Sequence, residues 1–448
     1  MLKTRKIASI NFVSQLSLRK RLIDGLLWSL VNAVSTQGLT FLLSIIIANL
    51  LGKNLFGKFG IINSTFLTFV GVAQLATGYA ANKYVAEFRH SDKAKASRLI
   101  VLFSFISIIT GCLAGIVLLL GAPVISSFLR EPSLAPYFMI ISFAVFFGVF
   151  NGYQMGVLSG LESYFQIARV SIIMGLLNLF GCAIGVWLFG LKGIIVALVV
   201  NAFVQCFVFN RVVKRETILQ GIIPLGDGFR QIQQEGSIFF KFLFPAAFSG
   251  FFSMPALWVV NVILVRSADG FNQMALFSAV NTIRVFVVYV PTIFNKVIMS
   301  VLNNQKGLDN QQGYKKVFWF NIAITVGSVL FGAVIVGSLG QLILTMFGKD
   351  FKAGYPVLLV MLLATIFEGI SQSFYQVFQV QEKMWLSFWA IVVPRDCLMV
   401  VLAIFLIPYF GALGSAWAYT LALLLALSVT IFFSLRINRL ASCKILTT

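Results

Sequence analysis

The chain has 448 residues, of which 59% are hydrophobic and only 11% are charged, and its mean hydropathy is +0.95. Because a soluble protein carries about 25% charged residues, this composition excludes a soluble domain and predicts an all-α polytopic membrane protein. The net charge of +20 comes from 34 Lys and Arg against 14 Asp and Glu, and most of it falls in loops, where membrane topology explains it without a nucleic-acid partner.

Twelve apolar segments follow one another along the chain, and each is long enough for one bilayer crossing as an α-helix. In the first half they cover residues 22–51, 59–81, 99–120, 136–158, 167–189 and 194–213. In the second half they cover residues 238–265, 274–302, 317–344, 355–379, 386–407 and 412–435. The connections are short, and the longest of them, between the halves, has no apolar segment.

The basic residues of the connecting segments predict the orientation. If the N-terminus is cytoplasmic, 24 Lys and Arg lie on the cytoplasmic side and 7 on the opposite side. Since cytoplasmic loops carry the excess of Lys and Arg, we expect both termini in the cytoplasm and an even number of helices.

The two halves resemble each other at a nearly constant offset. Phe128 matches Phe347 at 219 residues, Phe189-Gly190 matches Phe410-Gly411 at 221, and the segment from Gly57 matches 275–277 at 218. Each half crosses the membrane six times, an even number, so both halves enter the bilayer in the same orientation. This is a parallel repeat of two six-helix lobes, which we expect to surround a central hydrated cavity. The predicted units are a basic N-terminal segment 1–21, the lobe 22–213, a cytoplasmic linker 214–237, the lobe 238–435 and a cytoplasmic tail 436–448.

A polar stripe marks the tenth segment. Glu368, Gln372, Gln376 and Gln379 recur at helical spacing, and Tyr375 flanks them. Lipid does not solvate a carboxylate and three amides, so the stripe faces either a wet cavity or neighbouring helices that it hydrogen-bonds. We interpret it as the wall of an inward-facing vestibule.

Two arginines fall near the middle of the membrane. Arg284 has Asn281 one turn before it, and Arg395 is followed by Asp396. A guanidinium group presents up to five donors that match phosphate oxygens, so both arginines are candidate contacts for an anionic ligand, and pairing of Arg395 with Glu368 is the structural alternative. Glu368 and Asp396, with Asp24 as a weaker candidate at the start of the first helix, are candidate sites for Na+ or H+ coupling.

Catalytic signatures are missing from the sequence. His90 is the sole histidine and lies in a charged loop, the five cysteines show no metal-ligand spacing, and no phosphate-binding GxxxxGK[ST] stretch occurs. We therefore expect no enzymatic activity, no metal and no organic cofactor.

Four motifs carry a resemblance to a known family over residues 22–435. They are LGKNLFGKFG at 51–60, GVLSGLE at 156–162, LTMFGKDF at 344–351 and PYFGALGSAWA at 408–418. In these the chain resembles the polysaccharide transporter family of Wzx-type flippases, within the multidrug/oligosaccharidyl-lipid/polysaccharide exporter (MOP) superfamily.

The resemblance implies a protein of the bacterial inner membrane that moves undecaprenyl-diphosphate-linked oligosaccharide units for O-antigen, capsule or exopolysaccharide synthesis. Its implied partners are the lipid-linked oligosaccharide, membrane lipids, a polysaccharide polymerase and a chain-length regulator. Two alternatives remain open at this point. One is a cation-coupled multidrug exporter of the same superfamily, and the other is a membrane-embedded polysaccharide polymerase or ligase, for which the non-cytoplasmic loops are short.

Overall fold

The computed structural model describes the backbone of residues 2–74, 77–222, 244–307, 311–381 and 383–443, and side chains from residue 27 to 437 with interruptions around 75–76, 223–250, 290–311 and 382. The first half contains α1 (Leu2–Ala73), α2 (Thr77–Phe88), α3 (Lys93–Phe128), a 3-10 turn (Pro132–Leu134), α4 (Ala135–Gly160) and α5 (Tyr164–Leu219). The second half contains α8 (Phe244–Val265), α9 (Gly270–Gly307), α10 (Gln311–Met346), a 3-10 turn (Lys349–Gly354), α11 (Tyr355–Val380), α12 (Met384–Ser387), α13 (Val393–Phe410) and α14 (Ala412–Cys443).

Two of these helices are helix pairs joined at a single glycine. Gly52 in α1 has φ 73° and Gly190 in α5 has φ 59°, in the left-handed region that side chains with a Cβ avoid. Within the described residues, nine helices are long and apolar enough to cross a membrane, two of them contain such a break, and Phe251–Val265 is a further, shorter apolar helix. The predicted count of twelve spans is therefore confirmed.

The backbone conformation of the two halves also shows the repeat that the sequence predicts. Gly190 (φ 59°, ψ −136°) and Gly411 (φ 53°, ψ −126°) are 221 residues apart and adopt almost the same conformation. Each half places a 3-10 turn after its third helix and follows it with a 26-residue helix, α4 or α11. The two halves thus share a chain path as well as a sequence pattern.

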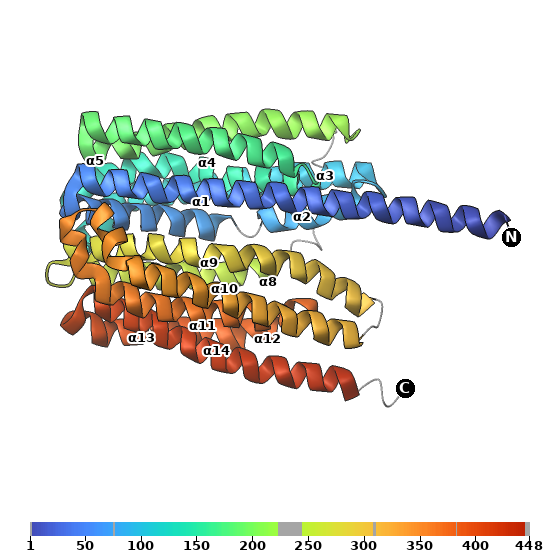
Figure 1. Ribbon diagram of the computed structural model, residues 1–448. Coiled ribbons are helices and arrows are strands. Elements are labelled where there is room, and N and C mark those ends of the chain that lie inside the picture. The colour runs from blue at the N-terminus through green and yellow to red at the C-terminus, as the bar shows by residue number, and fades with distance from the viewer. Residues whose placement is uncertain (1, 75–76, 223–243, 308–310, 382, 444–448) are drawn as a thin grey trace.

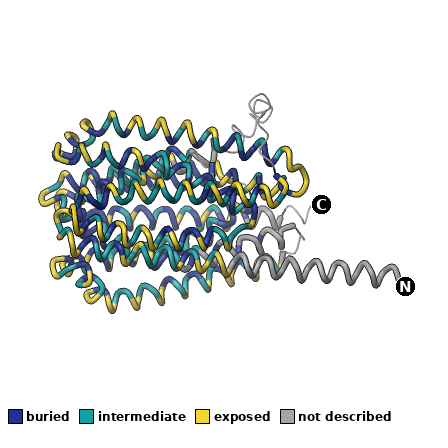
Figure 2. Tube along the Cα trace, turned by 90° about the horizontal axis from the view of Figure 1, so that it is seen from above, coloured by how far each residue is buried: buried dark blue, intermediate teal, exposed yellow. Residues whose placement is uncertain are grey.

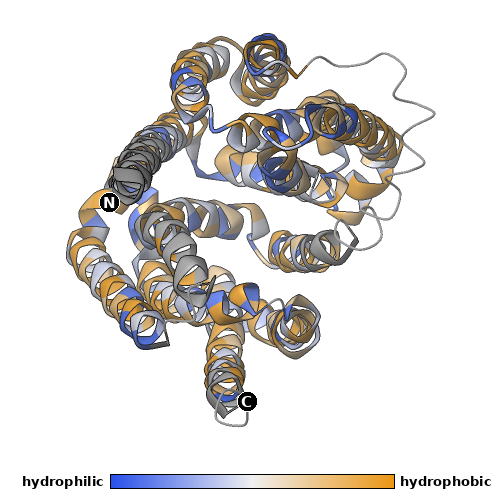
Figure 3. Cartoon of the chain, turned by 90° about the vertical axis from the view of Figure 1, so that its right-hand side faces the viewer, coloured by the Kyte–Doolittle hydropathy of each residue, from blue (hydrophilic) through white to orange (hydrophobic). Residues whose placement is uncertain are grey.

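The helices lie side by side in one bundle, with the first half on one side and the second half on the other (Figure 1). The end of the bundle that holds both termini is called the proximal end below. The opposite end is called the distal end, and there α1 and α5 turn back at Gly52 and Gly190 and α13 passes into α14 at Gly411. Seen from the proximal end, the outward faces of the helices are mostly apolar (Figure 3).

Large apolar side chains are exposed all around this bundle. Trp187, Leu120, Phe331 and Phe405 are each at least 65% exposed, and exposed residues line the outer faces in Figure 2. A soluble surface does not carry so much contiguous apolar area, so these faces are in contact with lipid. The protein is a multi-pass membrane protein.

At the distal end, hydrogen bonds and aromatic contacts join side chains of the two lobes. Asn49 donates from Nδ2 to the carbonyl of Met346 at 2.6 Å, and the ring of Phe56 packs against Phe347 and Phe351. Two cation–π contacts cross the same interface, Lys58 over Phe271 at 5.2 Å and Arg266 over Phe128 at 4.7 Å. Deeper in the bundle, Trp258 donates to Thr65 and Asn261 donates to Ser64. The distal end is therefore sealed by side chains of both lobes.

Candidate functional site

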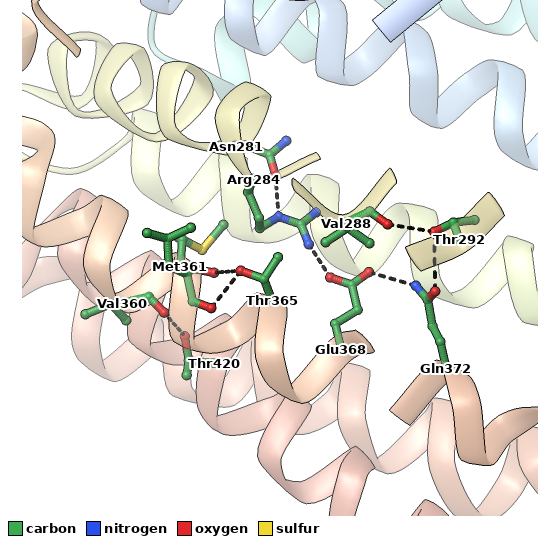
Figure 4. A network of polar contacts seen from close by, with 11 residues as sticks. Asn281, Arg284, Val288, Thr292, Val360, Met361, Thr365, Glu368, Gln372 and Thr420 are labelled. Carbon is green, nitrogen blue, oxygen red and sulfur yellow. Dashed lines mark hydrogen bonds and ion pairs between the residues drawn. The ribbon is translucent and has the colours of Figure 1, made fainter. Parts of the chain in front are cut away.

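The first polar centre forms where α9 and α11 face each other. Arg284 of α9 forms an ion pair with Glu368 of α11, and its Nε donates to Asn281 Oδ1 at 3.0 Å (Figure 4). Its guanidinium carbon lies 4.9 Å from the ring centroid of Tyr419 in α14. The side chains of Arg284 and Glu368 are 12% and 21% exposed, so the ion pair is largely buried but part of it remains accessible to solvent.

A chain of hydrogen bonds extends this centre along both helices. Gln372 donates from Nε2 to Glu368 Oε1 at 3.5 Å, and Thr292 donates to Gln372 Oε1 at 3.4 Å. Together with Val285, Val288 and Tyr289, the residues Arg284, Glu368, Gln372 and Thr292 line a cavity of about 220 Å³. Phe286, in the same part of α9, packs against Phe41 of α1 with ring centroids 5.8 Å apart, which places the cavity where the second lobe meets the first.

A second charged pair lies inside the same lobe. Arg395 donates from Nε to Asp396 Oδ1 at 2.7 Å, and Ser253 of α8 bridges both, donating to Asp396 at 2.6 Å and accepting from Arg395 at 2.9 Å. Asp396 is 2% exposed, whereas 28% of the Arg395 side chain is accessible. A buried carboxylate needs such partners, because its removal from water costs several kcal/mol. When one partner of a buried ion pair is removed, the protein loses ~3–5 kcal/mol of stability.

The local backbone explains the position of this pair. Residues Phe388–Val392 form a π-helical turn in which the N–H of Val393 bonds to the carbonyl of Phe388. Pro394 follows directly and has no N–H to continue the regular ladder. The wide turn rotates the start of α13, so that Arg395 and Asp396 come to lie beside Ser253.

Tyr419 of α14 lies beside the first pair, at the guanidinium group of Arg284, and is within electrostatic range of the second pair, Arg395 and Asp396. One phenol on α14 is thus near charged side chains of α9, α11 and α13.

The chain is similar to one protein-family model and to several solved transporter structures. A family model described as "Polysaccharide biosynthesis protein" matches residues 46–221. An inward-facing multidrug resistance MATE family transporter of the MOP superfamily superposes with a TM-score of 0.74 at 18% identity, over 91% of this chain and 96% of that one. The chain has the MOP superfamily fold. The family model covers less than half of the chain and lies in the first lobe, in agreement with the resemblance noted from the sequence, and the solved structures show the fold.

Two further MOP structures are similar to the chain. The outward-facing conformation of a MATE transporter has a TM-score of 0.64 at 18% identity, over 94% of this chain and 96% of that one. A MOP superfamily transporter from Pyrococcus furiosus, for which the reverse polarity of the binding pocket suggests a different function, gives the same TM-score, identity and coverage. No curated protein matches the sequence.

The MOP fold brings only part of the predicted stripe to the cavity. Glu368 and Gln372 line it, but Gln376 is 3% exposed and lies away from it. Gln376 donates to Asn295 Oδ1 at 2.8 Å and accepts from Asn321 at 3.1 Å, which joins α9, α10 and α11. The interpretation of the stripe as one continuous vestibule wall is therefore wrong, because different helices cover α11 along its length.

The other predicted residues are distributed as follows. Asn281 contacts Arg284, as its helical spacing indicated, while Tyr375 shares a hydrogen bond with Ser387 at 3.1 Å and stacks on Phe378. Gln379 is exposed beyond the cavity. Asp24 lies outside the residues whose side chains the structure describes. The alternative pairing of Arg395 with Glu368 is wrong, since each arginine has its own acid.

We expect Gln376→Leu to destabilise the protein by about 1–3 kcal/mol, because Asn295 and Asn321 would lose buried partners. The matched Gln379→Leu substitution, at an exposed position of the same helix, should leave stability unchanged. Thermal unfolding of both variants in detergent measures the difference. Equal melting temperatures for the two would contradict the role of the network.

Three residues of the polar centres were not singled out from the sequence, namely Ser253, Thr292 and Tyr419. Thr292 does follow Arg284 at helical spacing, two turns later, whereas Ser253 and Tyr419 come from other helices. A search for isolated polar residues at membrane depth would have found Asn321, which is fully buried. Their roles depend on which helices become neighbours.

Proposed function

We propose that the protein is a flippase that moves undecaprenyl-diphosphate-linked oligosaccharide units across the bacterial inner membrane by alternating access. In this proposal the proximal end faces the cytoplasm, as the distribution of basic residues indicates. The family model of polysaccharide biosynthesis proteins supports the class of substrate. A polymerase and a chain-length regulator would act on the delivered unit.

The observation that carries the proposal is Arg284 at the cavity between the lobes. Its Nε and one Nη are engaged by Asn281 and Glu368, which leaves further N–H donors of the guanidinium group for a ligand. A diphosphate offers several acceptor oxygens and more charge than a carboxylate, so it competes with Glu368 for the guanidinium. The amide of Gln372 and the hydroxyl of Thr292 are suited to sugar hydroxyls.

The shape of the molecule supports a state that loads from the cytoplasm. The distal end is sealed by contacts of both lobes. The fold also superposes better on the inward-facing MATE structure, at a TM-score of 0.74, than on the outward-facing one, at 0.64. We infer that the proximal side opens toward the cavity in this state, so that a headgroup reaches Arg284 before the lobes rearrange.

Reconstitution tests the proposal. Purified protein in liposomes should move a fluorescent undecaprenyl-diphosphate oligosaccharide between leaflets, whereas protein-free liposomes should not. An undecaprenyl monophosphate without sugar is the matched control and should move more slowly. Failure to move the diphosphate oligosaccharide in either direction, under any ion gradient, would exclude the flippase function.

Glu368 is the proposed coupling residue, with Asp396 as the second candidate and H+ or Na+ as the ion. Protonation of Glu368 would free Arg284 for the diphosphate, so transport should depend on the gradient. We expect Glu368→Gln to remove that dependence while the protein still folds, because Gln accepts a hydrogen bond from Arg284 without titrating. Transport rates with and without an imposed gradient check this, and an unchanged dependence on the gradient would refute coupling at Glu368.

The second candidate is a multidrug exporter, since the structural relatives include multidrug resistance MATE transporters. Intramembrane arginines repel cationic drugs and favour anionic cargo. Competition assays separate the two: a cationic dye that is exported as fast as the lipid-linked sugar would favour the drug exporter.

A further inference from the structure

A larger cavity, of about 550 Å³, lies at the proximal end of the first lobe, far from the charged pairs. It forms where the α2–α3 turn, the α4–α5 turn and the end of α5 meet. Its polar lining residues are Arg89, His90, Lys93, Glu162, Ser163, Gln166, Glu216 and Gln220. The proposed transport path does not use it, so its chemistry needs a separate explanation.

A nearly buried arginine lines the cavity. Arg89 is 6% exposed and forms an ion pair with Glu162. Its Nε has no hydrogen-bond partner but is itself buried. A ligand in the cavity therefore meets the accessible part of the guanidinium group, which has further N–H donors.

The walls of the cavity carry opposite charges. The basic residues Arg89 and Lys93 come from the α2–α3 turn and the start of α3, and Glu162 and Glu216 come from the α4–α5 turn and the end of α5. The acidic wall is held in place, because Ser163 donates to Glu216 at 2.9 Å and Gln220 donates to the carbonyl of Leu161 at 2.9 Å. A ligand that fits both walls has a negative group at one end and a positive group at the other.

The rim of the cavity is apolar and aromatic. Phe165 lines it, is 45% exposed, and packs edge-on against Trp28 of α1 with ring centroids 4.7 Å apart. Trp28 is itself 37% exposed. Exposed aromatic side chains of this kind are typical of the membrane–water interface. The cavity therefore opens at the level where phospholipid headgroups lie.

We propose that this cavity is a binding site for the headgroup of a phosphoethanolamine-type lipid. The phosphate lies against the accessible guanidinium edge of Arg89 and the ammonium of Lys93. The ammonium group donates to Glu216. The acyl chains leave over Phe165 and Trp28 into the surrounding bilayer. The site is independent of the proposed flippase activity, because none of its residues lines the cavity at Arg284.

The test is a binding titration of the purified full-length protein in detergent with short-chain lipids that differ only in the headgroup. We expect phosphatidylethanolamine to bind about tenfold more tightly than either of two control lipids. Phosphatidylglycerol lacks the ammonium group, and the ammonium group of phosphatidylcholine has no N–H. A tenfold difference in affinity corresponds to about one charge-assisted hydrogen bond. Soluble O-phosphoethanolamine, which lacks the acyl chains, should bind more weakly than the lipid.

Matched variants locate the site. Lys93→Gln should weaken phosphatidylethanolamine binding several-fold, roughly threefold to tenfold. Lys95→Gln removes the same charge two residues away, where Lys95 lies over the ring of Phe88 at 4.1 Å, and should not change binding. Glu216→Gln should reduce the preference for phosphatidylethanolamine over phosphatidylglycerol. Melting temperatures establish that all three variants are folded.

Three outcomes would overturn the proposal. The first is equal affinity for phosphatidylethanolamine and phosphatidylglycerol, which would indicate an anion site without a place for the ammonium. The second is an equal loss of binding in the Lys93 and Lys95 variants, which would indicate attraction by general surface charge. The third is equal affinity for soluble O-phosphoethanolamine, which would assign the cavity to a free metabolite instead of a lipid.

Discussion

Arg284→Gln is expected to lower the rate of oligosaccharide-lipid transport by about 100-fold, which corresponds to ~2.7 kcal/mol of lost charge-assisted hydrogen bonding. Arg284 is the cation that lines the cavity, and its spare donors face a ligand there. The flippase assay in liposomes measures the effect. Arg211→Gln is the matched control, because Arg211 stacks on Phe207 in the other lobe and lies outside the cavity.

Removing Arg284 also leaves Glu368 without its ion-pair partner, which costs about 3–5 kcal/mol when the remaining charge is buried. A loss of transport could then come from unfolding alone. The double variant Arg284→Gln, Glu368→Gln has no unpaired charge at this position and should recover the melting temperature but not the transport. Recovery of transport in the double variant would show that Arg284 acts only as a partner of Glu368.

Gly57→Ala is expected to shift the protein away from the state that is sealed at the distal end. A methyl group on Gly57 would overlap the carbonyl oxygen of Phe271, which belongs to the other lobe. Backbone cannot rotate away as a side chain can, so the two lobes would have to separate. With an overpacking cost of about 2 kcal/mol, the ratio of sealed to open molecules should fall roughly 30-fold.

Spin labels at Asn54 and Lys352, one in each lobe at the distal end, would report this change as a longer distance distribution. Gly38→Ala, on the other side of the Gly52 break in α1, is the matched control, because nothing lies within 4 Å of a Cβ at that position. Gly60→Ala should have a smaller effect, since it meets the side chain of Ser278, which can turn aside. An unchanged distance in Gly57→Ala would mean that the lobes absorb the methyl group without opening.

The sequence predicted the fold well because its signals are local. Apolar runs of bilayer length define the helices, and Gly190 and Gly411 mark the same turn in both halves. The contact of Asn281 with Arg284 also follows from helical spacing within α9. Each of these features depends on residues that are close together in the chain.

Contacts between helices could not be predicted in the same way. Glu368 pairs with Arg284 because α11 faces α9 at that depth. Arg395 turns to Asp396 and Ser253 because a π-helical turn precedes α13, and no periodicity of polar residues announces such a turn. Gln376 belongs to a buried network because Asn295 and Asn321 happen to come from two other helices. Such partners depend on the packing of the whole lobe.

The single-glycine turns at Gly52, Gly190 and Gly411 have a practical consequence for anyone who labels or modifies this protein. At these points one helix passes into the next with almost no connecting chain. An epitope or fluorescent domain inserted there would have to break two helices and displace the residues that hold the lobes together. Insertions are tolerated where backbone is exposed and makes few hydrogen bonds. The distal face is therefore the wrong side for a tag.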